Sequence, residues 1–260
     1  MVDRQSVLAR IADEVRACRA CPLHEGTRNA VPGEGNPDAE VMLIGEAPGQ
    51  NEDIQGRPFV GASGQFLTQM LAGAGYSRAE VFIANVAKHR PPANRDPLPD
   101  EIAACGDFLQ RQIDAIDPLV IVTLGRFSMA RFFPGEKISR IHGQPKLVGG
   151  RVVLPLYHPA AALHQGALRK VLEEDFATVP SVVERARRRR DRLDTAVEES
   201  VGRREPLPAT GQTTPDRPTR DIPRQASFGL TGVTVSDTEA ATPPQRDAAR
   251  SAPPRQLPLL

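Results

Sequence analysis

Four short, uninterrupted apolar runs mark the first part of the chain. They comprise residues 41–44, 81–86, 119–124 and 152–157, and a glycine directly follows the first and the third. Runs that are this short, continuous and rich in β-branched residues are typical of strands buried on both faces of a sheet. We therefore predict four buried strands at these positions.

Helical patterns lie between these runs, over residues 63–74, 100–116 and 125–133. A longer helical stretch covers about residues 170–198, and we expect it to bend or break at Pro180 because a proline inside a helix removes a hydrogen bond. The alternation of strands and helices predicts an α/β protein, with a three-layer α/β/α fold around a four-stranded parallel sheet. Ligands of such sheets bind beyond the carboxyl ends of the strands, so functional residues are expected there.

The composition changes sharply at Glu198. From there to Leu260 the sequence is dominated by Pro, Thr, Arg and Asp and shows no helical or alternating period. Such a segment buries too little apolar area to offset the entropy lost on ordering. We predict a globular domain over residues 1–197 and a disordered, Pro-rich tail over residues 198–260. The six arginines within residues 185–192 are typical of either a solvated helix face or a phosphate-binding patch.

The net charge and the cysteine content indicate the cellular compartment of the protein but not its binding partner. The 260 residues carry a formal net charge of +1, so any surface that binds nucleic acid must be local. Three cysteines, an odd and low number, argue against a disulfide framework and for a reducing compartment. The N-terminal residues lack the apolar core of a signal peptide, and no stretch approaches the roughly 20 apolar residues of a membrane span. We expect a monomeric cytoplasmic protein, in a bacterial cytosol or nucleoid, without membrane association.

The three cysteines and one histidine form a candidate metal site. Cys18 and Cys21 make a CxxC pair at the end of the first helical stretch, and Cys105 lies far downstream in the helix after the second strand. Iron–sulfur and zinc sites both need about four soft ligands. His89, which follows the second strand, is the best fourth candidate, although taken alone it equally fits an ordinary loop histidine.

Polar and aromatic residues follow the ends of the predicted strands. The sequence GEAPG with Glu46 comes after the first strand, and then come Glu52 and Phe59; Asn85 ends the second strand and His158 follows the fourth. The Asn85 amide offers a donor and an acceptor to a base edge, Phe59 a stacking face, and His158 a donor for developing negative charge. Plain structural roles also fit: a turn cap for Asn85, core packing for Phe59, an N-cap for His158 and solvated loop charges for the glutamates.

Three motifs together resemble one enzyme family. GEAPGxxEDxxGxPFVGxxG at residues 45–64, NVxKxRPPxNRxPxPxE at residues 85–101 and His158-Pro159 occur in the order and spacing of the family 4 uracil-DNA glycosylases. The resemblance covers about residues 15–180. It implies an α/β/α fold with a [4Fe–4S] cluster remote from the base pocket. It also implies monofunctional hydrolysis of the N-glycosidic bond of uracil in single- or double-stranded DNA, which starts base excision repair.

The resemblance also implies how uracil is bound. The base must be flipped out of the DNA before the enzyme can reach its glycosidic bond. Phe59 is expected to stack on it, and Asn85 to read its O4 and N3–H and so reject cytosine. His158, helped by backbone N–H groups of the turn that contains Gly45 and Ala47, is expected to stabilise negative charge at uracil O2.

Hydrolysis further requires a water molecule that attacks the sugar. Glu46 and Glu52 are both candidates for positioning this water, and the sequence does not decide between them. Apart from Lys88, no lysine lies in the motifs at the strand ends, so lyase activity through a Schiff base is not expected. Some relatives attach covalently to the abasic product through a histidine in an inserted basic loop. No such insert follows Lys88, so we do not expect covalent attachment here.

Four cysteines hold the cluster in that family. By position, Cys18, Cys21 and Cys105 match three of them, and His89 stands where the family has its remaining cysteine. A site with three cysteines and one histidine can still hold a [4Fe–4S] cluster. Zinc, which accepts the same ligand set, is the less favoured occupant.

The last five residues resemble a motif by which bacterial repair proteins bind the DNA sliding clamp. Gln256, Leu257, Leu259 and Leu260 are the candidate contacts, and a disordered tether with apolar anchors at its tip suits such binding. An accidental apolar end is the alternative. Two other functions also stay open for the whole chain: a metal-stabilised protein that binds damaged DNA without catalysis, and a glycosylase of this fold with another base specificity.

Overall fold

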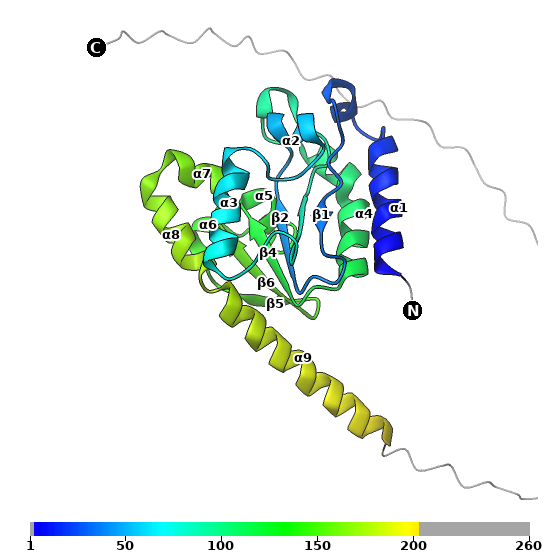
Figure 1. The fold of residues 1–260 in the computed structure, drawn as a ribbon, viewed down its shortest axis with the longest axis vertical. Helices are drawn as coiled ribbons and strands as arrows, with labels where there is room; N and C mark the ends of the chain where they lie inside the picture. Colours follow the sequence, from blue (N-terminus) through cyan, green and yellow to red (C-terminus); the bar gives the residue numbers. More distant parts are fainter. Residues whose placement is uncertain (1–2, 203–260) are drawn as a thin grey trace, which may run out of the picture. The chain divides into compact units, whose positions relative to one another are not determined.

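A mixed, mostly parallel six-stranded sheet forms the centre of the protein (Figure 1). The computed structural model describes residues 3–202, with side chains up to residue 195. The strand order is β1-β3-β2-β4-β6-β5. The four predicted strands form its parallel part: β2 (Val41–Gly45), β3 (Phe82–Asn85), β4 (Val120–Leu124) and β6 (Arg151–Leu156).

The predicted count of four strands was wrong, because a short antiparallel strand is added at each edge of the sheet. β1 (Glu34–Gly35) pairs with β3, and β5 (Lys146–Val148) pairs with β6. These strands have two and three residues, and their side chains are partly or fully exposed. Edge strands of this kind carry no continuous apolar run, so the pattern that revealed the central strands could not reveal them.

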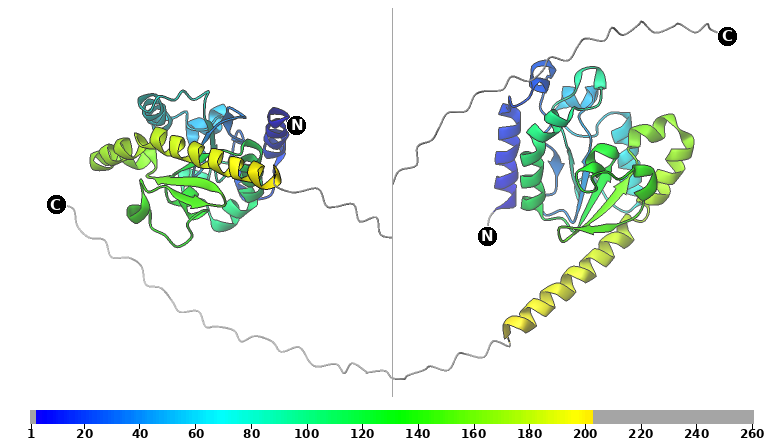
Figure 2. Two further views of the ribbon diagram at one scale, coloured as in Figure 1. Left: turned by 90° about the horizontal axis from the view of Figure 1, so that it is seen from below. Right: turned by 180° about the vertical axis from the view of Figure 1, so that it is seen from behind.

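Helices cover both faces of the sheet (Figures 1 and 2). Successive residues of β2 point to opposite faces, as the period of a strand requires. Leu43 packs in a core cluster with residues of α3 (Ala62–Gly73), α8 (Gly166–Phe176) and the start of α9 (Val179–Gly202). Met42 packs in a second cluster, with residues of α4 (Pro99–Ile116). α1 (Arg4–Ala17) packs on α4. The remaining helices are α2 (Gln50–Gln55), α5 (Arg126–Ala130), α6 (Ile138–Ile141), α7 (Pro159–His164) and the 3-10 helices η1 (Pro22–Gly26) and η2 (Pro92–Asn94).

The long helical stretch predicted over residues 170–198 consists of two helices. α8 ends at Phe176 and α9 covers Val179–Gly202, so the interruption falls just before Pro180. Pro180 is the second residue of α9, where its missing N–H costs no helical hydrogen bond. The proline therefore helps to begin a helix rather than to bend one.

Two of the six arginines within residues 185–192 form ion pairs with the body of the protein. Arg187 forms an ion pair with Glu40 at 2.7 Å, and Arg190 forms one with Asp117 at 3.3 Å. α9 packs against β4 and β6 and projects from the end of the sheet opposite to α2 (Figures 1 and 2). These ion pairs account for Arg187 and Arg190 and do not decide between a solvated helix face and a phosphate-binding patch.

Some of the predictions concern residues that the structure does not describe. The predicted tail lies outside the described residues, apart from the last turn of α9, and so do the five residues of the candidate clamp motif. Within residues 3–202, no helix combines the length and the apolar character that a membrane span requires.

Candidate active site

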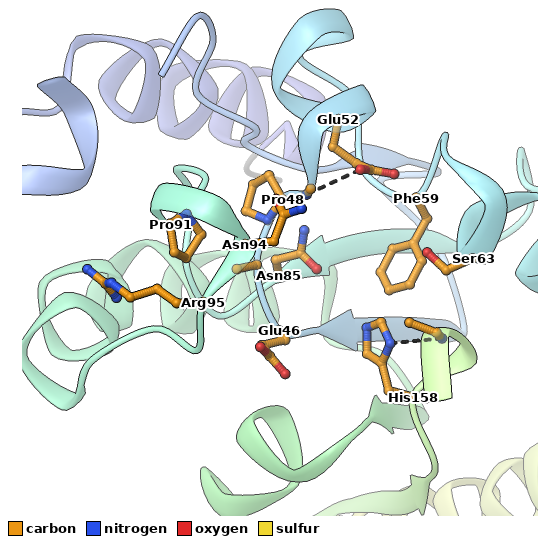
Figure 3. Close-up of a pocket in the computed structure, with 13 residues that line it drawn as sticks. Glu46, Pro48, Glu52, Phe59, Ser63, Asn85, Pro91, Asn94, Arg95 and His158 are labelled. Carbon is orange, nitrogen blue, oxygen red and sulfur yellow. Dashed lines mark hydrogen bonds between the residues drawn. The ribbon is translucent and has the colours of Figure 1, made fainter. Parts of the chain in front are cut away.

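A pocket of about 280 Å³ opens where β2, β3 and β6 end (Figure 3). This volume is at the small end for ligand pockets and suits a single base. Six of the predicted site residues line it: Glu46, Ala47, Glu52, Phe59, Asn85 and His158. The other lining residues are Pro48, Gly49, Ser63, Pro91, Asn94, Arg95 and Ala160. The rule that ligands bind beyond the carboxyl ends of parallel strands thus located the pocket.

Asn85 is the most buried polar residue of the pocket. Its side chain is 2% exposed, and its Oδ1 atom has no hydrogen-bond partner among the described residues. Gly45 lies opposite in the register of β2 and β3, and a Cβ atom there would come within 2.4 Å of this oxygen. Gly45 is therefore needed for the close packing of Asn85, and does not itself line the pocket. A buried acceptor without a partner is costly, which marks Asn85 as a group that awaits a ligand.

Phe59 and His158 form another wall of the pocket. Their ring centroids are 5.7 Å apart and their planes differ by 28° (Figure 3). Phe59 is buried and has a φ of 52°, a left-handed conformation that is rare for a bulky residue. Because the ring both packs in the core and faces the pocket, the two interpretations offered for Phe59 hold together.

The structure confirms the N-cap role of His158, and the residue also lines the pocket. It is the N-cap of α7, where its Nδ1 accepts a hydrogen bond from the Ala160 N–H at 3.1 Å. Burial lowers the pKa of His158 to about 4, so the imidazole is neutral near pH 7. A neutral ring that accepts at Nδ1 carries its proton on Nε2. The ring can therefore donate a hydrogen bond through Nε2 without being a cation.

The carboxylate of Glu52 is used within the protein. Its Oε1 accepts hydrogen bonds from the backbone N–H groups of Val60 and Gly61, both at 2.8 Å, and its Oε2 accepts one from Gly49 at 3.2 Å. The side chain is buried, so these bonds replace its hydration. Glu52 thus holds two loops of the pocket together, which leaves it poorly suited to position a water molecule.

Glu46 is in the opposite situation. It is half-buried, and its carboxylate has no hydrogen-bond partner within residues 3–195. The pKa of Glu46 is raised to about 7, mainly by burial and also by the carboxylate of Asp96, whereas Arg126 lowers it. Arg126 and Asp96 form an ion pair with each other. Of the two predicted glutamates, Glu46 is the one with a carboxyl group free to act in the pocket.

Sequence reasoning missed several residues at the mouth of the pocket. Asn94 has a φ of 53°, and its Oδ1 accepts a hydrogen bond from Arg90 at 2.7 Å, which leaves its NH2 group free. Arg95 is bound to Glu101 at 2.6 Å, and Ser63 lies at the start of α3. The RPPxNR motif was recognised, but nothing in its pattern indicated that Asn94 turns toward the base pocket.

The four predicted metal ligands lie on elements that pack together. Cys18 ends α1, Cys21 precedes η1, Cys105 lies in α4 against α1, and His89 follows β3. Burial raises the pKa of the Cys105 thiol, and the thiols of Cys21 and Cys18 are close enough to raise it further. His89 is buried, and its Nδ1 has no hydrogen-bond partner among the described residues. Three free thiols and an orphaned imidazole nitrogen are a suitable donor set for a metal group.

Within the described part of the chain, no three His, Cys, Asp or Glu side chains are placed to hold one metal ion. By donor type, the three thiols and the imidazole suit either an iron–sulfur cluster or zinc.

Lys88 connects this group of ligands to the pocket. It is fully buried, and its Nζ donates hydrogen bonds to Asn85 O at 3.0 Å, Pro32 O at 3.2 Å and Gln112 Oε1 at 2.8 Å. Its backbone N–H donates to Cys105 Sγ at 3.4 Å. The segment from Asn85 to Lys88 therefore has one fixed conformation, with a pocket residue at one end and the ligand group at the other.

Comparison with known proteins identifies a family for this geometry. Residues 32–177, more than half of the chain, match the family model described as the uracil DNA glycosylase superfamily. This range includes every residue that lines the pocket, together with His89 and Cys105. The Cys18–Cys21 pair lies outside it.

Individual relatives point the same way. The type-4 uracil-DNA glycosylase of Saccharolobus solfataricus is 52% identical over 179 residues, which cover 65% of this chain and 83% of the relative. That of Thermotoga maritima is 42% identical over 190 residues, covering 71% and 99%. A type-5 uracil-DNA glycosylase of Thermus thermophilus is 30% identical over 180 residues, covering 55% and 82%.

Proposed function

The chain belongs to the uracil-DNA glycosylase superfamily, and we propose that its pocket hydrolyses the N-glycosidic bond of uracil in DNA as a monofunctional type-4 enzyme. This reaction starts base excision repair. The observation that carries the assignment to uracil is the unpartnered Oδ1 of Asn85, buried beside the Phe59 ring in a pocket of single-base size.

Recognition follows from the hydrogen-bonding groups of Asn85. Its Oδ1 accepts from the N3–H of a flipped uracil, and its NH2 group donates to O4. Cytosine has no hydrogen on N3 and an amino donor in place of O4, so both bonds would be lost. Phe59 supplies the face on which the base stacks. The Oδ1 atom of Asn85, which is unpartnered in the free protein, thus gains a hydrogen bond from the substrate.

Bond cleavage leaves negative charge on uracil and positive character on the sugar. The Nε2–H of the neutral His158 donates to uracil O2 as this charge develops, helped by backbone N–H groups of the turn at Ala47. The Glu46 carboxylate orients a water molecule toward the sugar carbon and stabilises the positive charge that develops on the sugar. The contacts of Glu52 support a structural role for that residue instead.

Replacing Asn85 tests the recognition scheme. Asn85→Ala removes two hydrogen bonds in a desolvated pocket, worth roughly 3 kcal/mol together, so uracil release should fall by about 100-fold or more. The measurement is single-turnover release from an oligonucleotide with one uracil, followed by alkaline cleavage. Asn36→Ala, in an exposed turn, is the matched control and should keep the wild-type rate. Near-normal release by a folded Asn85→Ala enzyme would refute the scheme.

The pKa of Glu46 predicts the pH dependence of the reaction. Only the carboxylate orients the water, and burial raises the pKa of this group to about 7, so activity should rise as the pH increases through about 7. His158, with a pKa near 4, stays neutral across this range. Asp96→Asn removes a neighbouring negative charge and should move the rise to lower pH in single-turnover profiles.

Glu46→Gln is the control for this assignment. The variant should be slow at every pH and should lack the rise near pH 7. A profile of Glu46→Gln that still rises through this range would show that another group titrates, and would remove Glu46 from its role.

We also propose a [4Fe–4S] cluster held by Cys18, Cys21, Cys105 and His89. The free thiols, the unpartnered His89 Nδ1 and the type-4 relatives support it. Cys105 contacts the backbone of Lys88, and none of the four proposed ligands lines the pocket, which supports a structural rather than a chemical contribution of the cluster. Three thiols outside any disulfide also support a reducing, cytoplasmic location.

Metal analysis of histidine variants tests the cluster. Protein purified without oxygen should contain about four irons per chain and show broad visible absorption. His89→Cys should keep the iron, His89→Ala should lose part or all of it, and the exposed control His164→Ala should match the wild type. Zinc in place of iron would contradict the cluster, and full iron content in His89→Ala would contradict this ligand set.

For the C-terminal pentapeptide we propose binding to a DNA sliding clamp, supported by the sequence motif alone. Deletion of residues 256–260 should abolish binding to an immobilised bacterial clamp, as measured by surface plasmon resonance. Uracil release from a short free oligonucleotide should stay unchanged, because the pocket lies in the domain. Equal clamp binding by the full and truncated chains, or none by either, would refute the proposal.

A further inference from the structure

The loop that carries Phe59 is held in a conformation that the residue does not favour. The φ of Phe59 is 52°, and such a left-handed backbone in a bulky residue persists only where the surroundings enforce it. Gly64 is one part of these surroundings, because a Cβ atom there would lie 1.9 Å from the carbonyl oxygen of Phe59. The absence of a side chain at Gly64 permits the conformation but does not hold it.

Two oppositely charged side chains, those of Glu52 and Arg78, bind the peptide group between Phe59 and Val60. Its N–H donates to the carboxylate of Glu52 at 2.8 Å, and its carbonyl accepts from Nη1 of Arg78 at 3.0 Å. Both hydrogen bonds are charge-assisted and therefore stronger than ordinary backbone bonds. Nη2 of Arg78 also donates to the preceding carbonyl, that of Pro58, at 2.8 Å. Since the peptide is held at both its ends, it cannot rotate without breaking at least one of these bonds.

Arg78 reaches this loop from outside the pocket. It lies between α3 and β3, is largely buried, and is not among the residues that line the cavity. Its Nη2 is also bound to Glu34 at 2.9 Å, and Glu34 binds Arg57 at 2.7 Å. Only Arg78 of the two arginines also contacts the carbonyl groups of the Phe59 loop.

We propose that Arg78 is a positioning residue for uracil removal. Arg78 binds the carbonyl groups of Pro58 and Phe59 and so keeps Phe59 in its left-handed conformation. In this conformation the Phe59 ring lies beside His158 and faces the flipped base. The proposal rests on the proposed function, in which Phe59 stacks on uracil. Without Arg78 the peptide is held only by Glu52, the backbone of Phe59 relaxes toward a negative φ, and the ring leaves its place.

The test compares Arg78→Met with Arg57→Met. Both variants remove a partner of Glu34, but only Arg78→Met releases the loop. Single-turnover uracil release should fall by about 10- to 100-fold in Arg78→Met, because small misplacements of a bound group carry losses of this order. Inhibition by free uracil should weaken in parallel. Arg57→Met should stay within about twofold of the wild type in both measurements, and an unchanged rate in Arg78→Met overturns the proposal.

A double-mutant cycle separates positioning from general stability. If Arg78 acts through the Phe59 ring, Arg78→Met should cost little further rate in a Phe59→Leu enzyme, so that the two losses do not add. Fully additive losses would mean that Arg78 acts elsewhere and would overturn the proposal. If Arg78→Met does not fold, Arg78→Lys takes its place in the cycle, since an ammonium group can reach one of the two carbonyls.

The conformation itself can be measured without activity. In a crystal structure of Arg78→Met, the φ of Phe59 should be negative, and a retained positive φ contradicts the proposal. A wild-type enzyme that releases no uracil would refute the proposed function instead. The two failures are therefore distinguishable.

Discussion

The buried carboxylate of Glu52 is the fixed point on which the geometry of the pocket depends. It accepts hydrogen bonds from the turn after β2, at Gly49, and from the loop that follows Phe59, at Val60 and Gly61. A carboxylate out of contact with water is stable only when such donors surround it, so the turn and the loop must come together around it. This constraint brings the Phe59 loop to the pocket, where the ring lies beside His158.

The polar groups of the pocket are prepared for a neutral base that becomes an anion. The Asn85 amide is buried and unpaired, His158 is neutral with its proton on Nε2, and burial keeps the pKa of Glu46 near neutrality. Donors that are already oriented toward developing charge are the most effective source of catalysis in a desolvated site, and the fold supplies them from the ends of three strands.

The sequence revealed what depends on local pattern and missed what depends on spatial contacts. The four parallel strands were predictable because continuous burial leaves continuous apolar runs, whereas β1 (Glu34–Gly35) is too short and too exposed to leave one. Glu46 and Glu52 are six residues apart in the same motif, and only their contacts separate a free carboxylate from one bound to three N–H groups. Arg78 left no signal, because it recognises backbone carbonyls that any residue carries.

The central claim is that this pocket hydrolyses the bond between uracil and deoxyribose. The most direct measurement is strand cleavage of a labelled oligonucleotide with one uracil, with and without alkali, beside matched oligonucleotides with thymine or hypoxanthine. We expect breaks at uracil alone, and only after alkali, since the enzyme leaves an intact abasic strand. Breaks at thymine or hypoxanthine instead would show that the protein is a glycosylase with another base specificity. Breaks before alkali would contradict a monofunctional mechanism, and none at all from folded, iron-loaded protein would leave a domain that binds damaged DNA without catalysis.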